Sequence, residues 1–504
     1  MVSTEEKLAD LKTRLQEVGD LEGANAVLGW DQSTYMPNGG ADARGRQMAT
    51  LGRLAQEKFT DMAVGHLLDD LQSYAASLPY DHDDAALIRA TQRRYVRDTQ
   101  IPAAFLAQKY EHASKTYQVW AEARPANDFK RVQPYLEKTL ELSQQTAEYF
   151  SGYEHIADPL IDFADYGMRA SRVRQVFAEL RSQLVPLVET ITAQPLADDS
   201  CLKQHFPEDQ QLAFGRKVIE RFGYDFNSGR QDKTHHPFMT KLGSGDVRIT
   251  TRVKPNNFAE AFFSTTHEAG HALYEQGVTP DYAGTPLDGG TSNGVHESQS
   301  RTWENLVSRS RGFWQHYYPE LQQAFPEQFG SVSLDTFYRA INKVERSLIR
   351  TDADEVTYNL HVMVRFELEL QMLEGKLAIK DLPEAWHAAY QADLGIRAPN
   401  DINGCMQDVH WYSWHIGGVF QAYTLGNILS AQFFSEAVKA NPSLPTDIAQ
   451  GHFAPLHAWL KEHIYQHGSK YTASELVERV TGRGLDIAPY MQYLRGKYGE
   501  LYQL

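Results

Sequence analysis

Apolar residues recur at the spacing of an α-helix from one end of this chain to the other. Leu8, Leu11, Leu15 and Val18 lie three or four residues apart, and the segment that begins at Ser171 repeats the pattern. Hydrophobic residues make up 42% of the 504 residues, which is enough to fill a large core. We therefore expect a mainly α fold built as a large helical bundle.

Two capping boxes predict where helices begin. Ser3 with Glu6, and Thr472 with Glu475, have the spacing at which a hydroxyl and a carboxylate cap a helix reciprocally. The pattern over residues 349–377 is also typical of one long helix.

The clearest strand signal lies in residues 237–253, PFMTKLGSGDVRITTRV. Val247 and Ile249 alternate with Arg248 and Thr250, which is the period of a strand. The GSG before them suits a tight turn, so we expect a small β-hairpin or short sheet.

Charge and composition exclude some partners. The formal net charge of -16 is spread along the chain, which argues against nucleic acid as a partner.

No apolar run reaches the roughly 18 residues of a membrane span, and the charged N-terminus is unlike a signal peptide. The two cysteines are far apart. We expect a cytoplasmic protein with reduced thiols and no membrane partner.

Residues 262–277, FFSTTHEAGHALYEQG, contain the string HExxH. His267 and His271 are four residues apart, so a helix presents both imidazoles on one face, where they can bind one zinc ion. Glu268 is rotated by about 100° from His267, which leaves it beside the ion as a general base. The alternative is a solvated His-Glu-His face, but the surrounding amphipathic pattern without proline favours zinc.

A catalytic zinc needs a third protein ligand and an open position. No histidine follows His271 before His296, so the short metzincin spacing is absent. Residues 293–310, NGVHESQSRTWENLVSRS, are expected to form a second helix that supplies this ligand. His296, Glu297 and Glu304 are all candidates, and spacing alone does not choose between them. For each, the alternative is a surface charge or a capping residue.

Two arginines are candidates for binding a peptide substrate. Arg248 shares one face of the expected strand with Arg252, and an exposed edge strand can pair with an extended peptide. The alternative is an edge whose charges deter aggregation. Arg350 can bind a terminal carboxylate through two N–H groups, although a salt-bridge ladder with Asp354 is the simpler interpretation.

Residues 404–427, GCMQDVHWYSWHIGGVFQAYTLGN, are rich in histidine and aromatic residues. His410 or Tyr423 can donate a hydrogen bond to an oxyanion. Aromatic residues at this density often only pack, but Gln407 and Asp408 beside them indicate a polar lining that contacts substrate.

Taken in order, these strings resemble the carboxypeptidase Taq family of zinc metallocarboxypeptidases. They are LGWDQSTYMPNGGADARGRQ (28–47), HPF (236–238), DVRIT (246–250), HEAGH (267–271), HESQ (296–299), IRTDAD (349–354), GCMQDVHW (404–411) and YMQYLRGKYGELY (490–502).

The resemblance implies one zinc ion per chain, held by His267, His271 and Glu297, with cobalt as a substitute and Glu268 as the base. It implies a helical fold with a deep central groove, and homodimers. It also implies removal of single C-terminal residues from peptides with broad specificity, by zinc-activated water. Arg350 is then the first choice for the substrate carboxylate and Arg248 the second.

The expected organisation is one metallocarboxypeptidase unit over residues 1–504. About residues 1–130 would form a lid-like helical region, and about 230–430 the catalytic core. The alternatives are a helical zinc oligopeptidase that cuts internally and, as a different class, a non-catalytic peptide-binding scaffold that contains a metal.

Overall fold

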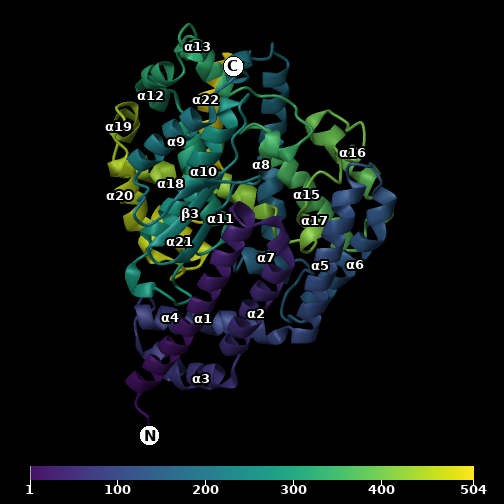
Figure 1. Ribbon diagram of the computed structural model, residues 1–504, viewed down its shortest axis with the longest axis vertical. Helices are drawn as coiled ribbons and strands as arrows, with labels where there is room; N and C mark the ends of the chain where they lie inside the picture. The colour runs from purple at the N-terminus through teal and green to yellow at the C-terminus, as the bar shows by residue number, and fades with distance from the viewer. Residues whose placement is uncertain (1) are drawn as a thin grey trace. The chain divides into compact units, whose positions relative to one another are not determined.

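The computed structural model describes residues 2–504, and helices dominate it (Figure 1). The helices of the first half are α1 (Thr4–Thr34), α2 (Ala41–Phe59), α3 (Met62–Ser77), α4 (Asp83–Gln100), α5 (Ala103–Ala123), α6 (Phe129–Glu148), α7 (Asp158–Ala164), α8 (Ala170–Thr192) and α9 (Glu208–Phe222). The later ones are α10 (Phe258–Gly277), α11 (Asn293–Arg301), α12 (Arg311–Ala324), α13 (Pro326–Phe329), α14 (Leu334–Ile341), α15 (Tyr358–Leu373), α16 (Leu382–Leu394), α17 (His410–Ser413), α18 (Gln421–Ala440), α19 (Leu444–Ala449), α20 (Ala454–His463), α21 (Ala473–Thr481) and α22 (Ala488–Tyr502). The mainly α prediction is confirmed.

Both predicted capping boxes are present. Ser3 and Glu6 bond reciprocally at the start of α1, and Thr472 and Glu475 do so at the start of α21. These contacts satisfy backbone N–H groups that a helix start leaves without a partner. Among residues 2–504, no helix combines the length and apolar character that a membrane span requires.

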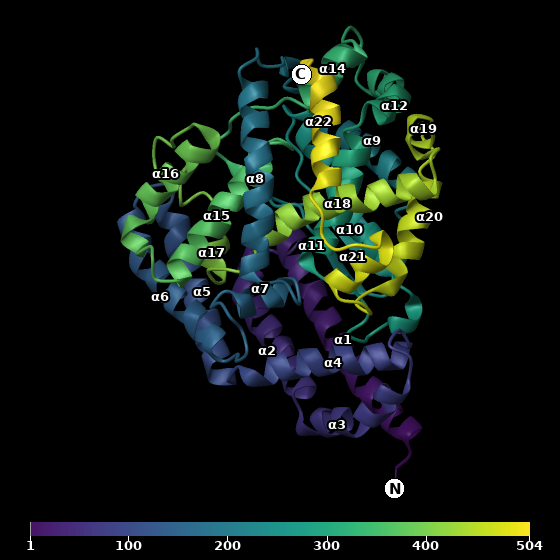
Figure 2. The same ribbon diagram turned by 180° about the vertical axis from the view of Figure 1, so that it is seen from behind.

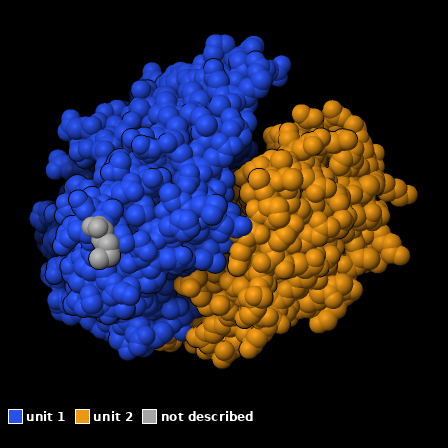
Figure 3. Space-filling view, turned by 90° about the horizontal axis from the view of Figure 1, so that it is seen from below, with its two compact units in different colours: residues 1–99, 198–341, 430–485 blue, residues 100–197, 342–429, 486–504 orange. Residues whose placement is uncertain are grey.

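The chain divides into two compact units (Figure 3). The first contains residues 1–99, 198–341 and 430–485, and the second contains residues 100–197, 342–429 and 486–504. In the first unit, apolar side chains of α1 to α4 form a buried cluster that includes Leu11, Phe59, Leu68 and Ile88. The single functional unit, with a lid over about 1–130 and a core over about 230–430, stays a prediction.

The second unit is organised around α8 and α15. α22 runs beside α8 (Figure 2), although the two are far apart in the sequence. Gln194, just after α8, donates a hydrogen bond to the backbone carbonyl of Tyr502 at 2.9 Å. Phe177 of α8 packs edge-on against Phe366 of α15.

A three-stranded sheet lies in the first unit, with the strand order β1-β3-β2. The predicted hairpin is confirmed, because β2 (Met239–Gly243) is antiparallel to β3 (Asp246–Thr251). The sequence did not predict β1 (Gln231–Lys233), which pairs parallel to β3. Its three polar or charged residues show no apolar alternation, so only the pairing with β3 identifies it as a strand.

The prediction of one helix over residues 349–377 is wrong at its start. Arg350–Asp352 form a single 3-10 turn, and the helix α15 begins at Tyr358. The Asp354 carboxylate accepts bonds from the backbone N–H groups of Val356 and Thr357 and from the Thr357 hydroxyl. This local network competes with continuous helix. Arg350 and Asp354 therefore do not share a helix face.

Candidate metal centre

The HExxH string lies on α10, which packs at the centre of the first unit. Asn257 caps its start by accepting a bond from the Glu260 N–H. Phe258 and Phe262 stack on each other inside an aromatic cluster, which fixes the helix against its neighbours. The opposite stripe presents His267 and His271 one turn apart.

Gly270 allows α11 to approach α10 closely. A Cβ atom at Gly270 would lie 2.6 Å from both the carbonyl oxygen of Gln299 and the Cα of Ser300. The backbones of α10 and α11 are therefore in contact, between the two histidines of the motif. Ser292 caps α11 by accepting from the Val295 N–H, so Glu297 lies in the first turns of a well-formed helix.

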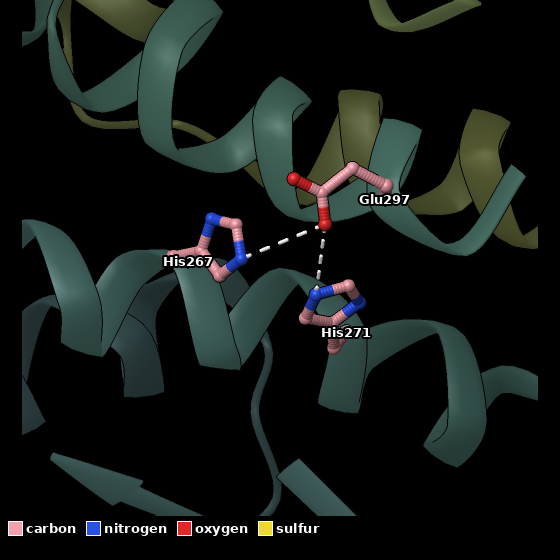
Figure 4. Close-up of side chains that lie close together, drawn as sticks. All are labelled: His267, His271 and Glu297. Carbon is pink, nitrogen blue, oxygen red and sulfur yellow. Dashed lines mark ion pairs between the residues drawn. The ribbon is translucent and has the colours of Figure 1, made fainter. Parts of the chain in front are cut away.

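This approach brings Glu297 to the two histidines (Figure 4). Its Oε2 lies 3.8 Å from His267 Nε2 and 3.5 Å from His271 Nε2. Ligand atoms of the three residues all lie within 4.8 Å of one another. Zinc ligands at about 2.0–2.2 Å in tetrahedral directions are about 3.4 Å apart. The three side chains therefore fit one ion between them.

The electrostatics suit a cation. Burial lowers the pKa of His271 to about 3, so its imidazole is neutral and able to bind a metal. Burial alone would raise the pKa of Glu297, but Arg301 and the two histidines hold it well below its ordinary value. Arg301 Nε donates to Glu297 Oε1 at 2.7 Å. This bond leaves Oε2 directed at the histidines.

The other two candidates for the third ligand lie outside this set. Glu304 is in the π-helical segment η4 (Thr302–Ser308), and its Oε2 accepts a bond from Nδ1 of His267 at 2.9 Å. His296 Nδ1 lies 2.5 Å from His271 Nδ1, on the ring edge that faces away from Glu297. Glu304 and His296 therefore contact Nδ1 of the two histidines, whereas Glu297 faces their Nε2 atoms.

Glu268 is buried, with 7% of its surface exposed. Burial raises the pKa of its carboxyl group to about 7, and the negative charges of Glu297 and Glu304 add to this, against the opposing effect of His267. A carboxylate of this basicity can accept a proton near neutral pH.

Four other predicted site residues form a network in the second unit. Arg350 donates from Nη2 to Asp408 Oδ1 at 2.7 Å, and its backbone N–H donates to Gln407 Oε1 at 3.0 Å. The Arg350 guanidinium lies 5.2 Å from the Tyr423 ring centre. Only 6% of Arg350 is exposed.

His410 joins the same network. Its Nε2 is 3.3 Å from the Tyr423 hydroxyl, and burial together with Arg350 lowers the pKa of His410 to about 4. In a bond between a neutral imidazole and a phenol, one group donates to the other, and the accepting group can donate its own hydrogen to a further acceptor such as an oxyanion.

Arg248 is separate from these residues. It lies on β3 in the first unit, where Nε and Nη2 donate to Asp246 at 2.8 and 2.7 Å. Its guanidinium stacks over the Trp30 ring at 4.4 Å. The structure thus places Arg248 and Arg350 in different units.

Sequence reasoning did not identify several charged residues around the histidines. Arg301 was detectable as the residue four positions after Glu297 on one helix, and Glu275 as the residue four positions after His271. No sequence signal indicated Lys241, which reaches Glu275 from β2 at 3.2 Å.

Comparison with known proteins agrees with these observations. The family model described as "Carboxypeptidase Taq (M32) metallopeptidase" matches residues 10–498. Thermostable carboxypeptidase 1 of Thermus thermophilus is 41% identical over 498 residues, covering 97% of each chain. Carboxypeptidase 1 of Bacillus subtilis is 35% identical over 504 residues, covering 99% of each.

Solved structures show the same fold. The M32 carboxypeptidase from Deinococcus radiodurans superposes with a TM-score of 0.96 at 53% identity, covering 99% of this chain and 100% of that one. A carboxypeptidase structure from Pyrococcus furiosus gives a TM-score of 0.94 at 32% identity, over 99% and 100% of the two chains. This chain belongs to the carboxypeptidase Taq (M32) family of metallopeptidases, and it is a peptide hydrolase of that family.

Proposed function

We propose that this protein is a zinc-dependent metallocarboxypeptidase that removes single residues from the free C-terminus of peptides with broad specificity. The observation that carries this proposal is the convergence of two imidazoles and one carboxylate on a single point beside a buried, basic glutamate. Two histidines and a glutamate form a typical catalytic zinc set, which leaves a position for water or substrate.

His267, His271 and Glu297 would hold one ion per chain, and cobalt would substitute for zinc. The bound ion would supply Lewis-acid chemistry, polarising the scissile carbonyl and acidifying a water molecule. Glu297 stays charged because Arg301 lowers its pKa, and His271 stays neutral because it is buried. Both side chains are therefore in the protonation state that binding requires.

Glu268 would act as the general base. It would take a proton from the attacking water and deliver it to the leaving amine. Its burial supports this role, because a carboxylate with an ordinary pKa would be too weak a base and its conjugate acid would not persist near neutral pH.

The network in the second unit would bind the substrate. Arg350 would bind the terminal carboxylate, with Asp408 and Gln407 orienting its guanidinium. His410 or Tyr423 would donate to the oxyanion of the tetrahedral intermediate. Arg248 is the second choice for the carboxylate.

We also propose a cytoplasmic homodimer with no nucleic-acid or membrane partner. The net charge of -16 supports the absence of nucleic acid, and the family resemblance supports the dimer. The internal-cutting oligopeptidase is the main alternative activity, and the metal-containing scaffold is the alternative without catalysis.

The variant Glu268→Gln distinguishes a catalytic peptidase from a non-catalytic scaffold that contains a metal. We expect kcat to fall about 10²–10⁴-fold, because the amide that replaces this carboxylate cannot take a proton. Elemental analysis should still find one zinc per chain. Glu260→Gln, on the same helix near its start, is the matched control and should keep kcat. Full activity in Glu268→Gln, or a wild-type protein without bound metal, would overturn the proposal.

A further inference from the structure

The Nδ1 atoms of His267 and His271 have different partners. His267 Nδ1 faces the Glu304 carboxylate at 2.9 Å. His271 Nδ1 faces another imidazole, the Nδ1 atom of His296, at 2.5 Å. The far nitrogen of His296, Nε2, lies 2.9 Å from Glu275 Oε1. A chain of three side chains therefore extends from His271 to a buried carboxylate.

One arrangement of protons satisfies this whole chain. If Nε2 of His271 binds the ion, its Nδ1 carries the hydrogen and must donate it. His296 Nδ1 is then the acceptor, so the N–H of His296 is on Nε2. That N–H donates to Glu275, which is ionised because His296, Lys241 and a backbone N–H lower its pKa to about 2, against the effect of burial.

Glu275 is itself fixed in place. The backbone N–H of Gly290 donates to its Oε1 at 2.9 Å, and Lys241 Nζ lies 3.2 Å from its Oε2. Lys241 also forms an ion pair with Asp288.

The His296 ring has little freedom to turn. Tyr274 packs against one face, with ring centres 5.2 Å apart. On another side, a Cβ at Gly290 would lie only 2.6 Å from His296 Cδ2. Backbone and aromatic contacts thus hold the ring in the orientation that meets both His271 and Glu275.

We propose that His296 is a positioning residue for the metal centre. It accepts the Nδ1 proton of His271 and so directs Nε2 of that ring at the ion, and Glu275 fixes the tautomer of His296. This inference rests on the proposed function, since it assumes that His271 binds a metal. It gives the histidine of HESQ a role distinct from that of the neighbouring Glu297.

The side chain at position 296 can be changed so that each ring nitrogen is tested separately. In His296→Asn the amide oxygen takes the place of Nδ1 and can accept from His271. In His296→Gln the amide takes the place of Nε2, so it reaches Glu275 and leaves His271 without an acceptor. His296→Leu removes both groups.

The experiment measures Co²⁺ affinity of the full-length protein by chelator competition, together with the visible absorption spectrum of the bound cobalt. Outer partners of metal-binding histidines affect affinity by about 10–100-fold. We expect His296→Asn to stay within about threefold of wild type with an unchanged spectrum. We expect His296→Gln and His296→Leu to lose about tenfold or more, with a shifted spectrum.

Equal affinity for the Asn and Gln variants, or wild-type affinity in all three, would overturn the inference and leave the proposed function standing. A wild-type protein that binds no cobalt would overturn both. Thermal melts of the metal-free proteins check folding. If His296→Leu does not fold, the comparison of Asn with Gln decides alone, because the two side chains differ in which nitrogen they replace.

Discussion

At the scale of single residues, Glu369 on α15 is a carboxyl group buried against an indole. Its Oε1 accepts from Trp411 Nε1 at 2.7 Å, and burial raises its pKa from an ordinary 4.5 to about 8. Between these two values the folded protein keeps a proton that the unfolded chain releases. The free energy of unfolding therefore decreases as pH rises from about 4.5 to about 8.

Glu369→Gln should remove this decrease in the free energy of unfolding, because an amide does not titrate and its oxygen still accepts a hydrogen bond from Trp411. We expect its Tm at pH 8 to exceed that of wild type by about 3 °C or more. At pH 4.5 and below, the two proteins should melt together. Differential scanning calorimetry at both pH values checks this, and a Tm difference independent of pH would contradict it.

In the proposed function, Arg350 is the first choice for binding the substrate's terminal carboxylate. Lysine at this position keeps the charge beside Asp408 but loses the paired N–H groups that bind a carboxylate. We expect Arg350→Lys to raise KM for a free-acid peptide about tenfold, with a smaller change in kcat. Steady-state kinetics test this, with Tm as the check on folding, and an unchanged KM would assign the carboxylate to another residue such as Arg248.

The sequence predicts the helices that carry His267, His271 and Glu297, but it leaves the long-range partners of these side chains open. His267 and His271 share a face by spacing alone. Glu297 was distinguished from His296 only through the family resemblance. The bonds from His296 to Glu275 and from Lys241 to Glu275 connect different elements, so no local pattern predicts them.

At the scale of elements, the contact between α10 and α11 determines where Glu297 lies. Gly270 is the residue that permits it, since a side chain there would meet the backbone at Gln299 and Ser300. The neighbour in this contact is backbone, which cannot rotate away. Any increase in size at position 270 must therefore separate the two helices.

Gly270→Ala should destabilise the protein by about 1–3 kcal/mol and weaken zinc binding, because α11 moves Glu297 away from the histidines. Gly496→Ala, on α22, is the matched control: apart from its chain neighbours and the nearby backbone of its own helix, no described atom lies within 4 Å of its added Cβ, so we expect unchanged or slightly higher stability. Chemical denaturation and zinc titration measure both variants. Normal zinc affinity in Gly270→Ala would contradict this role of the helix contact.

Elements with strong local signals were predictable. The capping boxes marked the starts of α1 and α21, and period two marked β3. The short strand β1 depends on pairing with β3, and residues 349–357 depart from helix because Asp354 bonds neighbouring N–H groups. Pairing with β3 thus defines β1, which has no apolar pattern of its own, and the bonds of Asp354 outweigh the helical pattern before α15.

At the scale of the whole molecule, membership of the M32 family rests on the full length of the chain, since the family model covers residues 10–498. His267, His271 and Glu297 belong to one compact unit and the Arg350 network to the other. The reaction that we propose for this chain is the metal-dependent removal of C-terminal residues.

The most direct test is mass spectrometry of one peptide, as free acid and as C-terminal amide, incubated with the protein before and after chelation and after zinc is restored. We predict a ladder of products shortened from the C-terminus of the free acid, lost with the chelator and regained with zinc, while the amide stays intact. Internal fragments from both peptides, or a ladder that survives complete removal of metal, would contradict the account.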